Sequence, residues 1–533
     1  MPPSSLFNAA ELFVDRNLLE GRGDKVAIEC GTERVTYSQV GERVNRVGDA
    51  LRTELDVRME ERVALLLVDS PAFAYSFFGA IKIGAVPVPI NTLWKARDYA
   101  YVLNDTRARV AIVSDALVPR LREIRRADLK YLKHVVVVGT PERDAHRFDR
   151  LLEAGAPNLT PADTTSDDAA FWLYSSGSTG VPKGCVHLQH DMVVCAEGYG
   201  RGVLGMRESD RCFSVAKLFF AYGLGNALYM PFSVGATSIL WPGAPAAAEV
   251  FGVIERHHPT LFFSVPTGYA MLLAQHRAPE ADAAPPRDFD LSSIRQAVSA
   301  GEALPPPLFD RFKARFGIEI LDGIGSTETL HMFLSNRPGA VRPGSSGLPV
   351  PGYDVRVLDD ERRTLPAGEI GNLFVRGDSI CAGYWNQHAK TIDTIEGAWI
   401  RTGDKFYEDA DGFFWHCGRA DDMLKVGGLW VSPVEVESAL LAHPDVQECA
   451  VIGHEDGDGL VKPLAFVVMR AGVTAGPDTP AELMEIVRAQ LPDYKRPRWI
   501  EFVSELPKTA TGKIQRFRLR EGAARPEEAR QRL

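Results

Sequence analysis

The segment Tyr174–Gly184 holds the residues of this chain that are best suited to chemistry. Its glycines let the backbone adopt positive φ and approach a ligand closely. Lys183 adds a positive charge, and the preceding apolar run, Ala169–Leu173, is typical of a strand. Four residues supply hydroxyl donors: Ser175, Ser176, Ser178 and Thr179. Glycines, hydroxyl groups and one lysine together predict a loop that binds phosphate.

This loop differs from the phosphate-binding loop of the P-loop NTPases, in which the last glycine is followed by Lys and then by Ser or Thr. Here Lys183 follows Pro182 and precedes Gly184. The alternative is a flexible Gly/Ser linker, but a linker needs no ordered Pro-Lys-Gly end. We therefore favour a phosphate-binding loop of another type.

Tyr174–Gly184 resembles the signature of the adenylate-forming superfamily, which comprises acyl-CoA synthetases, adenylation domains and beetle luciferases. In that family the loop contacts the β- and γ-phosphates of ATP. Alone, each of the other motifs could be a helix N-cap, a surface turn or a solvated charged tail. Their occurrence in family order extends the resemblance over nearly the whole chain. These motifs are Gly323–Glu328, Arg401–Asp404, Gly418–Gly428 and Leu506–Ile514.

The resemblance implies a complete ATP site. Thr327 would contact the α-phosphate, and Glu328 would hold Mg²⁺, which prefers oxygen ligands. Asp404 would accept hydrogen bonds from both ribose hydroxyls, and Arg419 would make a second ribose contact. The chain departs from the pattern at Ile324, where many members carry an aromatic residue that stacks on adenine. The implied ATP ligands are Ser175, Ser176, Gly177, Ser178, Thr179, Gly180, Lys183, Gly301, Glu302, Ala303, Asp322, Gly323, Ile324, Gly325, Ser326, Thr327, Asp404 and Arg419.

A two-step reaction follows from the resemblance. The substrate carboxylate attacks the α-phosphorus of ATP and pyrophosphate leaves; a thiol then attacks the acyl-adenylate. Because such transfer depends on positioning and charge stabilisation, the implied catalytic residues are Lys183, Thr327, Glu328 and Lys513. Between the two steps the small domain would rotate about the hinge residue Asp421. The implied CoA-facing residues are Lys425, Gly427, Gly428, Leu429 and Trp430.

The segment Lys217–Asn226 occupies the family's acyl-pocket position. Amino-acid-activating members carry an Asp there, whereas this chain has Phe220, Ala221 and Tyr222, so an amino acid is disfavoured. Aromatic side chains suit a flat aromatic ring, although such a stripe is more often plain core. The closest resemblance is to the benzoate–CoA ligases of bacterial aromatic catabolism. The implied substrate pocket is Phe220, Ala221, Tyr222, Gly223, Gly325, His331 and Met332.

Several functions remain open at this point. The predicted function is ATP-dependent benzoate–CoA ligation with ATP, Mg²⁺ and coenzyme A. The alternatives are a ligase for hydroxybenzoate or aminobenzoate, and an aryl-acid adenylation enzyme that loads a separate carrier protein, since only a short tail follows Lys513. A non-catalytic nucleotide-binding regulator is disfavoured, because sensing a nucleotide needs neither Lys513 nor Glu328 nor Asp404. Small pocket residues predict relaxed specificity, since one methyl group discriminates only about 10–200-fold.

Strand and helix patterns alternate around these motifs. Continuous apolar runs predict strands buried on both faces, and Val40, Val44, Val47 and Leu51 recur at helical spacing. This alternation indicates an α/β fold with a largely parallel sheet. The expected organisation is a large N-terminal multi-subdomain α/β domain, residues 1–420, and a small mobile C-terminal α+β domain, residues 421–533. The expected strands and helices include Val63–Val68, Val110–Val113, Val135–Val138, Ala72–Lys82, Val434–Leu441, Ala450–Gly453, Leu464–Met469 and Ala481–Leu491.

Composition excludes several classes of protein. A chain of 533 residues with a net charge of −10 is a poor general polyanion binder, which disfavours nucleic acid as a partner. The seven cysteines form no C-x-x-C pair, so we expect reduced thiols rather than a zinc site. The longest apolar region, Phe77–Trp94, is interrupted by Lys82 and two prolines and falls short of the roughly 20 residues of a spanning helix. We expect a cytoplasmic protein with small-molecule substrates and no membrane partner; a homodimer is left open.

Overall fold

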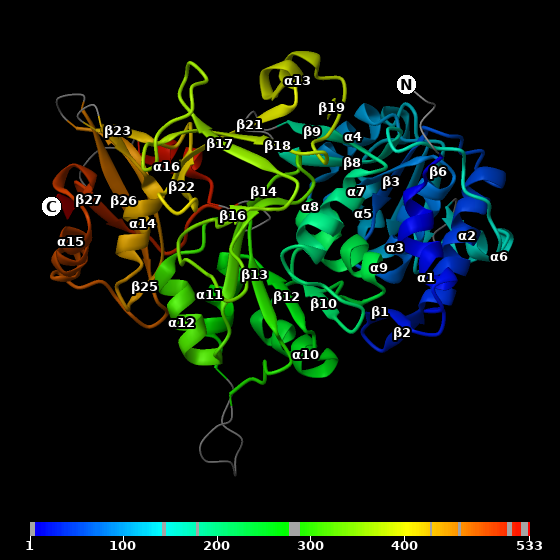
Figure 1. Cartoon of the computed structure of the whole chain (residues 1–533), viewed down its shortest axis with the longest axis horizontal. Helices are drawn as coiled ribbons and strands as arrows, with labels where there is room; N and C mark the ends of the chain where they lie inside the picture. Colours follow the sequence, from blue (N-terminus) through cyan, green and yellow to red (C-terminus); the bar gives the residue numbers. More distant parts are fainter. Residues whose placement is uncertain are drawn as a thin grey trace, which may run out of the picture.

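The structure is a computed structural model that describes residues 6–140, 145–176, 181–276, 288–426, 429–456, 460–508, 514–523 and 531–532. Figure 1 shows a large N-terminal part, built from several sheets and their helices, and a smaller C-terminal part at the opposite end of the molecule. This arrangement confirms the predicted α/β fold class. The division at residue 421 remains a prediction.

The first sheet is parallel and has the strand order β4-β3-β5-β6-β7. Its central strand β5 (Val110–Ser114) is buried along its whole length, as its continuous apolar run predicts. Helix α2 (Tyr37–Thr53) begins with a capping box between Thr36 and Gln39 and packs against α3 (Pro71–Lys82). The strand predicted over Val63–Val68 ends at Leu66. The other strands are β3 (Arg62–Leu66), β4 (Val86–Pro89), β6 (His134–Val138) and β7 (His146–Arg147).

The second sheet has nine strands among the described residues, in the order β16-β15-β14-β13-β12-β10-β11-β1-β2. Six of these, from β14 to β1, run parallel, so the carboxyl ends of β10, β12, β13 and β14 meet at one edge. Ligands of open α/β sheets bind at such an edge. The strands are β1 (Val26–Cys30), β2 (Glu33–Thr36), β10 (Arg211–Ser214), β11 (Thr237–Leu240), β12 (Leu261–Ser264), β13 (Gln296–Ser299), β14 (Ile320–Gly325), β15 (Met332–Ser335) and β16 (Leu348–Pro349).

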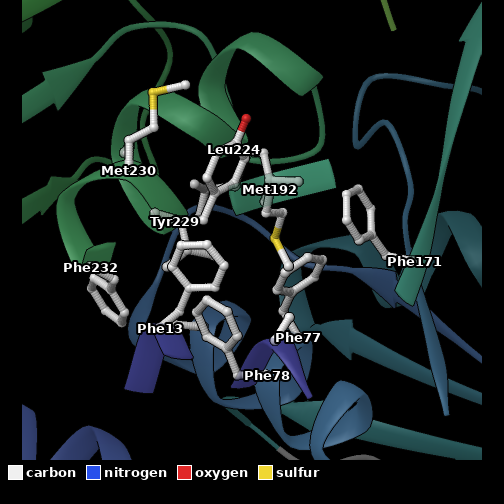
Figure 2. Packing of buried hydrophobic residues seen from close by; sticks show 14 of the residues in the cluster. Phe13, Phe77, Phe78, Phe171, Met192, Leu224, Tyr229, Met230 and Phe232 are labelled. Carbon is white, nitrogen blue, oxygen red and sulfur yellow. The ribbon is translucent and has the colours of Figure 1, made fainter. Parts of the chain in front are cut away.

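Helices α10 (Ala247–His257), α11 (Pro266–Ala274) and α12 (Pro306–Phe316) connect the parallel strands of this sheet. Elsewhere a phenylalanine-rich core joins the two sheets (Figure 2). Phe78 of α3 stacks on Phe232 of α9 (Met230–Val234) with ring centroids 5.8 Å apart. Phe77 packs against Phe171 at 5.4 Å. This core supports α8 (Ala221–Leu224) and η5 (Gly225–Tyr229), which carry the predicted aryl pocket.

A third sheet contains the strands on either side of the predicted phosphate loop. Strands β8 (Ala169–Ser176) and β9 (Pro182–Leu188) form an antiparallel hairpin, and β19 (Gly383–Tyr384) pairs with β9. A fourth sheet is antiparallel and pairs β17 with β18, β18 with β21, and β21 with both β20 and β22. Its strands are β17 (Asp354–Leu358), β18 (Gly371–Arg376), β20 (Ile395–Glu396), β21 (Trp399–Glu408) and β22 (Phe414–Arg419).

The C-terminal part contains the hairpin β23 (Leu424–Val426) and β24 (Leu429–Val431) and the sheet β25-β26-β27-β28. The expected helices and strands occur here with shifted ends: the helix predicted over Val434–Leu441 covers Pro433–Leu440, and the strand predicted over Ala450–Gly453 covers Val446–Glu455. The elements are α14 (Pro433–Leu440), β25 (Val446–Glu455), β26 (Val461–Met469), α15 (Thr479–Gln490), β27 (Trp499–Phe502), α16 (Arg516–Ala523) and β28 (Gln531–Arg532).

Short helices complete the fold. Within the described ranges, no helix is long and apolar enough to cross a membrane. All seven cysteines are free thiols. The remaining helical elements are η1 (Glu11–Asp15), α1 (Arg16–Leu19), α4 (Ala96–Asp105), η2 (Asp115–Leu117), α5 (Val118–Arg122), η3 (Arg126–Asp128), α6 (Phe148–Ala154), α7 (Asp191–Cys195), η4 (Ala196–Arg201), α13 (His388–Thr394) and η6 (Asp493–Lys495).

Candidate active site

The predicted phosphate loop connects the two strands of the β8–β9 hairpin. Ser175 pairs with Lys183 across this hairpin, and its buried Oγ has no hydrogen-bond partner among the described residues. Lys183 lies on β9, at the foot of the loop. The predicted ligands Gly177, Ser178, Thr179 and Gly180, and the side chain of Ser176, lie outside the described residues. The loop therefore begins and ends on paired strands, and this rigid base fixes the position of the lysine.

Lys183, Glu328 and Tyr384 form a compact polar group beside the loop. Lys183 Nζ lies 2.9 Å from Glu328 Oε1 and 2.8 Å from the Tyr384 hydroxyl oxygen. The Tyr384 hydroxyl donates to Glu328 Oε1 at 2.7 Å, and the lysine ammonium also lies 4.2 Å from the tyrosine ring centroid. The Lys183 and Glu328 side chains are only 16% and 13% exposed. Each of the three groups therefore contacts the other two in a nearly dry environment.

Burial alone would raise the pKa of Glu328, but the Lys183 ammonium and the Tyr384 hydroxyl outweigh it, and the pKa lies below its usual value. Glu328 is therefore ionised at neutral pH. The mostly buried Glu328 carboxylate, together with the hydroxyl of the preceding residue Thr327, offers hard oxygen ligands of the kind that Mg²⁺ takes. These residues therefore fit the predicted metal site.

The main chain at Thr327 and Glu328 is held from two sides. The Cys381 amide donates to the Glu328 carbonyl at 2.8 Å. His187 is fully buried, and its Nε2 lies 2.8 Å from the Thr327 carbonyl oxygen while its Nδ1 lies 2.7 Å from Asp191 Oδ2. Burial lowers the pKa of His187, but the Asp191 carboxylate more than offsets this, so the pKa is raised. A protonated imidazole can donate to both acceptors at once.

The predicted adenine side of the site follows the ends of β13 and β14. Gly301 adopts a φ of +95°, where glycine is favoured, directly after β13. Asp322 is buried, and its Oδ2 accepts from the Leu304 amide at 3.2 Å. Burial raises the pKa of the Asp322 carboxyl well above its usual value. Ile324 is half-buried, and Glu302, Ala303 and Ser326 are partly exposed at the same edge.

Glycines allow close backbone contacts in the second motif. A Cβ at Gly323 would lie 2.7 Å from the Leu334 carbonyl oxygen, and a Cβ at Gly325 would lie 2.4 Å from the His331 carbonyl oxygen. Both contacts are closer than a real Cβ tolerates, so larger residues would push β14 away from β15. The motif Gly323–Glu328 therefore begins with the tightly paired end of β14, and its last three residues follow the strand.

The predicted ribose residues lie opposite each other on β21 and β22. Asp404 pairs with Arg419 in strand register, and Arg419 Nη1 donates to Asp404 Oδ1 at 3.0 Å. Burial would raise the pKa of Asp404, but His416 and Arg419 lower it below its usual value. The segment Arg401–Asp404 is part of a strand, and the positive φ of Gly403 (+79°) provides the local bend. An ionised carboxylate here is ready to accept two hydroxyl groups.

The predicted aryl pocket is formed by the end of β14 and the start of α8. Phe220, Ala221 and Tyr222 are partly exposed, whereas Gly223, His331 and Met332 are buried. The Tyr222 hydroxyl contacts the carbonyl oxygens of Ser264 and Val298, both at 3.3 Å, and so ties α8 to β12 and β13. The structure therefore brings the predicted aryl residues to the sheet edge that also carries Glu328.

The C-terminal residues predicted to face CoA are exposed. Leu429 and Trp430 are 52% and 42% exposed, and Lys425 Nζ lies 5.6 Å from the Trp430 ring centroid. Asp421 lies two residues after the end of β22, and its main-chain oxygen accepts a hydrogen bond from Arg520 of α16 at 3.4 Å. The other predicted residues of this part, Gly427, Gly428 and Lys513, lie outside the described residues.

Three residues at this site were not predicted from the sequence. Tyr384 follows the last glycine of a loop and has no motif of its own, and only the pairing of β19 with β9 brings it to Lys183. His187 and Asp191 are spaced as a helical i, i+4 pair, but His187 lies on β9 rather than on a helix. The only signal in the sequence was that His187 and Asp191 follow the predicted phosphate loop closely along the chain.

Comparison with known proteins agrees with this geometry. Residues 15–385 match the family described as AMP-binding enzyme, and residues 435–513 match the AMP-binding enzyme C-terminal domain. The chain is 49% identical over 515 residues to a benzoate–CoA ligase of Thauera aromatica, with 96% of each chain covered. It is 46% identical to a 4-hydroxybenzoate–CoA/benzoate–CoA ligase of Rhodopseudomonas palustris, covering 97% of this chain and 94% of that one. A solved anthranilate CoA ligase in complex with anthranoyl-AMP matches with a TM-score of 0.92 and 47% identity over 97% of both chains.

The fold and the order of the site segments therefore define an adenylate-forming enzyme, as predicted. The chain belongs to the AMP-binding enzyme family.

Proposed function

We propose that this chain is an AMP-forming benzoate–CoA ligase. It is an acid–thiol ligase that uses ATP and CoA, in keeping with its family and with relatives of nearly full-length coverage. The observation that supports the proposal is the composition of the predicted aryl pocket. Its wall of Phe220, Ala221 and Tyr222 has no carboxylate to pair with an ammonium group, and it lies at the same sheet edge as Glu328.

In the first step the benzoate carboxylate oxygen attacks the α-phosphorus, and the bond from that phosphorus to the pyrophosphate oxygen breaks. Lys183 has its ammonium at the foot of the phosphate loop, where it stabilises charge on the leaving phosphates. Thr327 positions the α-phosphate. Lys513 contacts the carboxylate and the α-phosphate, and its role rests on the family motif Leu506–Ile514.

Asp404 and Arg419 orient the ribose in this proposal, and the phosphate loop with Gly301–Ala303 and Asp322–Ser326 surrounds the rest of ATP. Glu328 would hold Mg²⁺, which supplies neutralisation of phosphate charge when it is bound. In the structure the Glu328 carboxylate is paired with the Lys183 ammonium and accepts a hydrogen bond from the Tyr384 hydroxyl. ATP binding gives the lysine a phosphate partner and leaves the carboxylate free for the metal.

In the second step the CoA sulfur attacks the benzoyl carbonyl carbon, the bond from that carbon to the AMP oxygen breaks, and the thiol proton goes to solvent. Residues 1–420 and 421–533 act as two domains that rotate at Asp421 between the steps. The exposed Lys425, Leu429 and Trp430, with Gly427 and Gly428, then face the CoA thiol arm.

The test is AMP formation from ATP in the presence of CoA, measured with a panel of acids. The panel holds benzoate, hydroxybenzoates, aminobenzoates, acetate and a medium-chain fatty acid. We expect strong, CoA-dependent activity with benzoate. Activity with only an aliphatic acid would refute the pocket assignment, and an adenylate never transferred to CoA would identify a carrier protein as the acceptor.

A further inference from the structure

Two cysteines lie in contact beside the polar group of the active site. Cys185 is fully buried on β9, and Cys381, which is 2% exposed, lies two residues before β19. With Tyr384 they form a small apolar cluster of their own, and a side-chain hydrogen bond joins the two thiols. The proposed reaction uses neither thiol, so this contact between two sulfurs has no role in the mechanism described above.

The two cysteines belong to the backbone segments that hold the phosphate-site residues. Cys185 follows Lys183 by two residues on β9, and it lies opposite Tyr384 where β9 pairs with β19. The Cys381 amide donates to the Glu328 carbonyl at 2.8 Å. A change in the distance between the two sulfurs therefore acts directly on the segments that position Lys183, Glu328 and Tyr384.

A cavity gives small molecules access to one of the two cysteines. It has a volume of about 760 Å³ and is lined by residues of β18 and of the segment that follows this strand. The exposed residues Arg376 and Asp378 belong to its lining, so the cavity opens to solvent. Of the two cysteines, both within the described ranges, Cys381 belongs to this lining and Cys185 does not. Cys381 is therefore the one that a small solute reaches first.

We propose that Cys381 and Cys185 are an oxidation site, at which a small peroxide forms a disulfide that slows adenylation. A cysteine that an oxidant can reach and that has a second thiol beside it is the usual arrangement for reversible oxidation. The effect on adenylation rests on the proposed function, whereas the formation of the disulfide does not.

The oxidation takes place in two steps. The Cys381 sulfur attacks one oxygen of hydrogen peroxide, the O–O bond breaks, and the thiol proton leaves with the other oxygen as water. The Cys185 sulfur then attacks the sulfur of the Cys381 sulfenic acid, the S–O bond breaks, and the Cys185 proton leaves with that oxygen as a second water. The two sulfurs together lose two electrons, and the peroxide gains them. A dithiol such as dithiothreitol reverses the oxidation by thiol–disulfide exchange.

The disulfide should disturb the phosphate site, because two sulfurs in non-bonded contact must approach each other to about 2 Å when the bond forms. Protein interiors are close-packed, so the backbone segments that carry the cysteines must shift. These segments hold Lys183 Nζ and Glu328 Oε1 at 2.9 Å from each other. Since a displacement of about 1 Å near the reacting groups can cost about 100-fold in rate, we expect ATP–pyrophosphate exchange to fall by about 10- to 100-fold.

The experiment treats the full chain with hydrogen peroxide, alkylates the remaining thiols and maps the peptides by mass spectrometry without reduction. We expect one linked pair of peptides, which contain Cys185 and Cys381, and a loss of exchange activity that dithiothreitol restores. The other five cysteines provide an internal control, because burial raises the pKa of each thiol and the thiolate is the reactive form. They should remain alkylated thiols: Cys30, Cys195, Cys212, Cys417 and Cys449.

Three variants separate the roles of the two sulfurs. Cys381→Ala removes the sulfur that meets the oxidant and should keep its exchange activity in peroxide. Cys185→Ala removes the second sulfur and should stop at the Cys381 sulfenic acid, which dimedone labels. The matched control is Cys212→Ala, since Cys212 is equally buried but lies on β10, and this variant should respond to peroxide as the wild type does. The peptide map of the wild type needs no variant, so it decides the question even if a variant fails to fold.

The outcomes are distinct. If peroxide leaves Cys381 a free thiol, or oxidises it without a link to Cys185, the inference is wrong. A disulfide that leaves exchange activity unchanged, or an equal loss of activity in Cys381→Ala, would overturn the proposed effect on adenylation. If the disulfide forms but no acid yields AMP in the untreated enzyme, the proposed function fails while the oxidation site stands.

Discussion

The Tyr384 hydroxyl should be needed for ATP use, because it contacts both charges beside the phosphate loop. Tyr384→Phe removes the bonds of 2.8 Å to Lys183 and 2.7 Å to Glu328 but keeps the ring on which the ammonium lies. Lys183 and Glu328 keep each other at 2.9 Å, so the loss should correspond to one hydrogen bond to a charged group. Such a bond contributes about 1.5–3 kcal/mol, and solvent screening is small because both side chains are mostly buried.

This free energy corresponds to a decrease of about 10- to 150-fold in kcat/KM for ATP. The assay is ATP–pyrophosphate exchange with benzoate, because it reports the adenylation step without CoA. The KM for the aromatic acid should change little, since Tyr384 contacts Lys183 and Glu328, which are proposed to act on the phosphates, and not the residues of the predicted aryl pocket. A decrease in kcat/KM for ATP with an unchanged KM for the aromatic acid would support a positioning role for the Tyr384 hydroxyl.

A second tyrosine gives a matched control. The Tyr75 hydroxyl accepts from Arg43 Nη1 at 2.6 Å, is equally buried, and belongs to α3 in the first part of the fold. Tyr75→Phe should leave pyrophosphate exchange unchanged. Exchange by Tyr384→Phe within twofold of wild type, or a loss of the same size in both variants, would refute the reasoning.

Two further predictions concern other parts of the site. Lys513→Ala should abolish adenylation and leave ATP binding, measured by calorimetry, largely intact; an unchanged ligation rate would contradict the catalytic assignment. The His187–Asp191 pair should make stability depend on pH: the pKa of His187 is raised in the folded state, so its contribution is full below the usual value of about 6.5 and declines as the pH rises through the folded value. The Tm advantage of wild type over His187→Phe should therefore shrink from neutral to alkaline pH, and an advantage that grows would show that the histidine is neutral.

The parts of the fold that depend on local pattern could be predicted from the sequence. Val110–Val113 is an uninterrupted apolar run and forms the fully buried β5, and the helical spacing of Val40 to Leu51 lies within α2. The secondary structure of each segment is determined by which of its own side chains are buried, and any apolar surface can serve as the packing partner. The ends of strands were less predictable. The strand that begins near Val63 stops at Leu66, the last residue paired with β5, whereas the apolar run that marks it in the sequence continues to Val68.

The contacts that complete the site could not be predicted in this way. Tyr384 is 201 residues from Lys183 along the chain, and only the pairing of β19 with β9 joins them. The motif Arg401–Asp404 taken alone could have been a surface turn, but Asp404 lies within the ten-residue strand β21, where it pairs with Arg419 of β22. Such pairings depend on which strand is adjacent, and the types of the residues themselves contain no information about that.

The pairing of charged side chains explains how the protein folds around a polar site. A buried lysine and a buried glutamate would each destabilise the empty protein if left alone, since an uncompensated buried charge costs several kcal/mol. Lys183 and Glu328 avoid this by pairing, and Tyr384 adds a hydrogen bond to each. In the proposed mechanism ATP would replace Glu328 as the partner of Lys183, so that neither charge is left unpaired in an apolar environment.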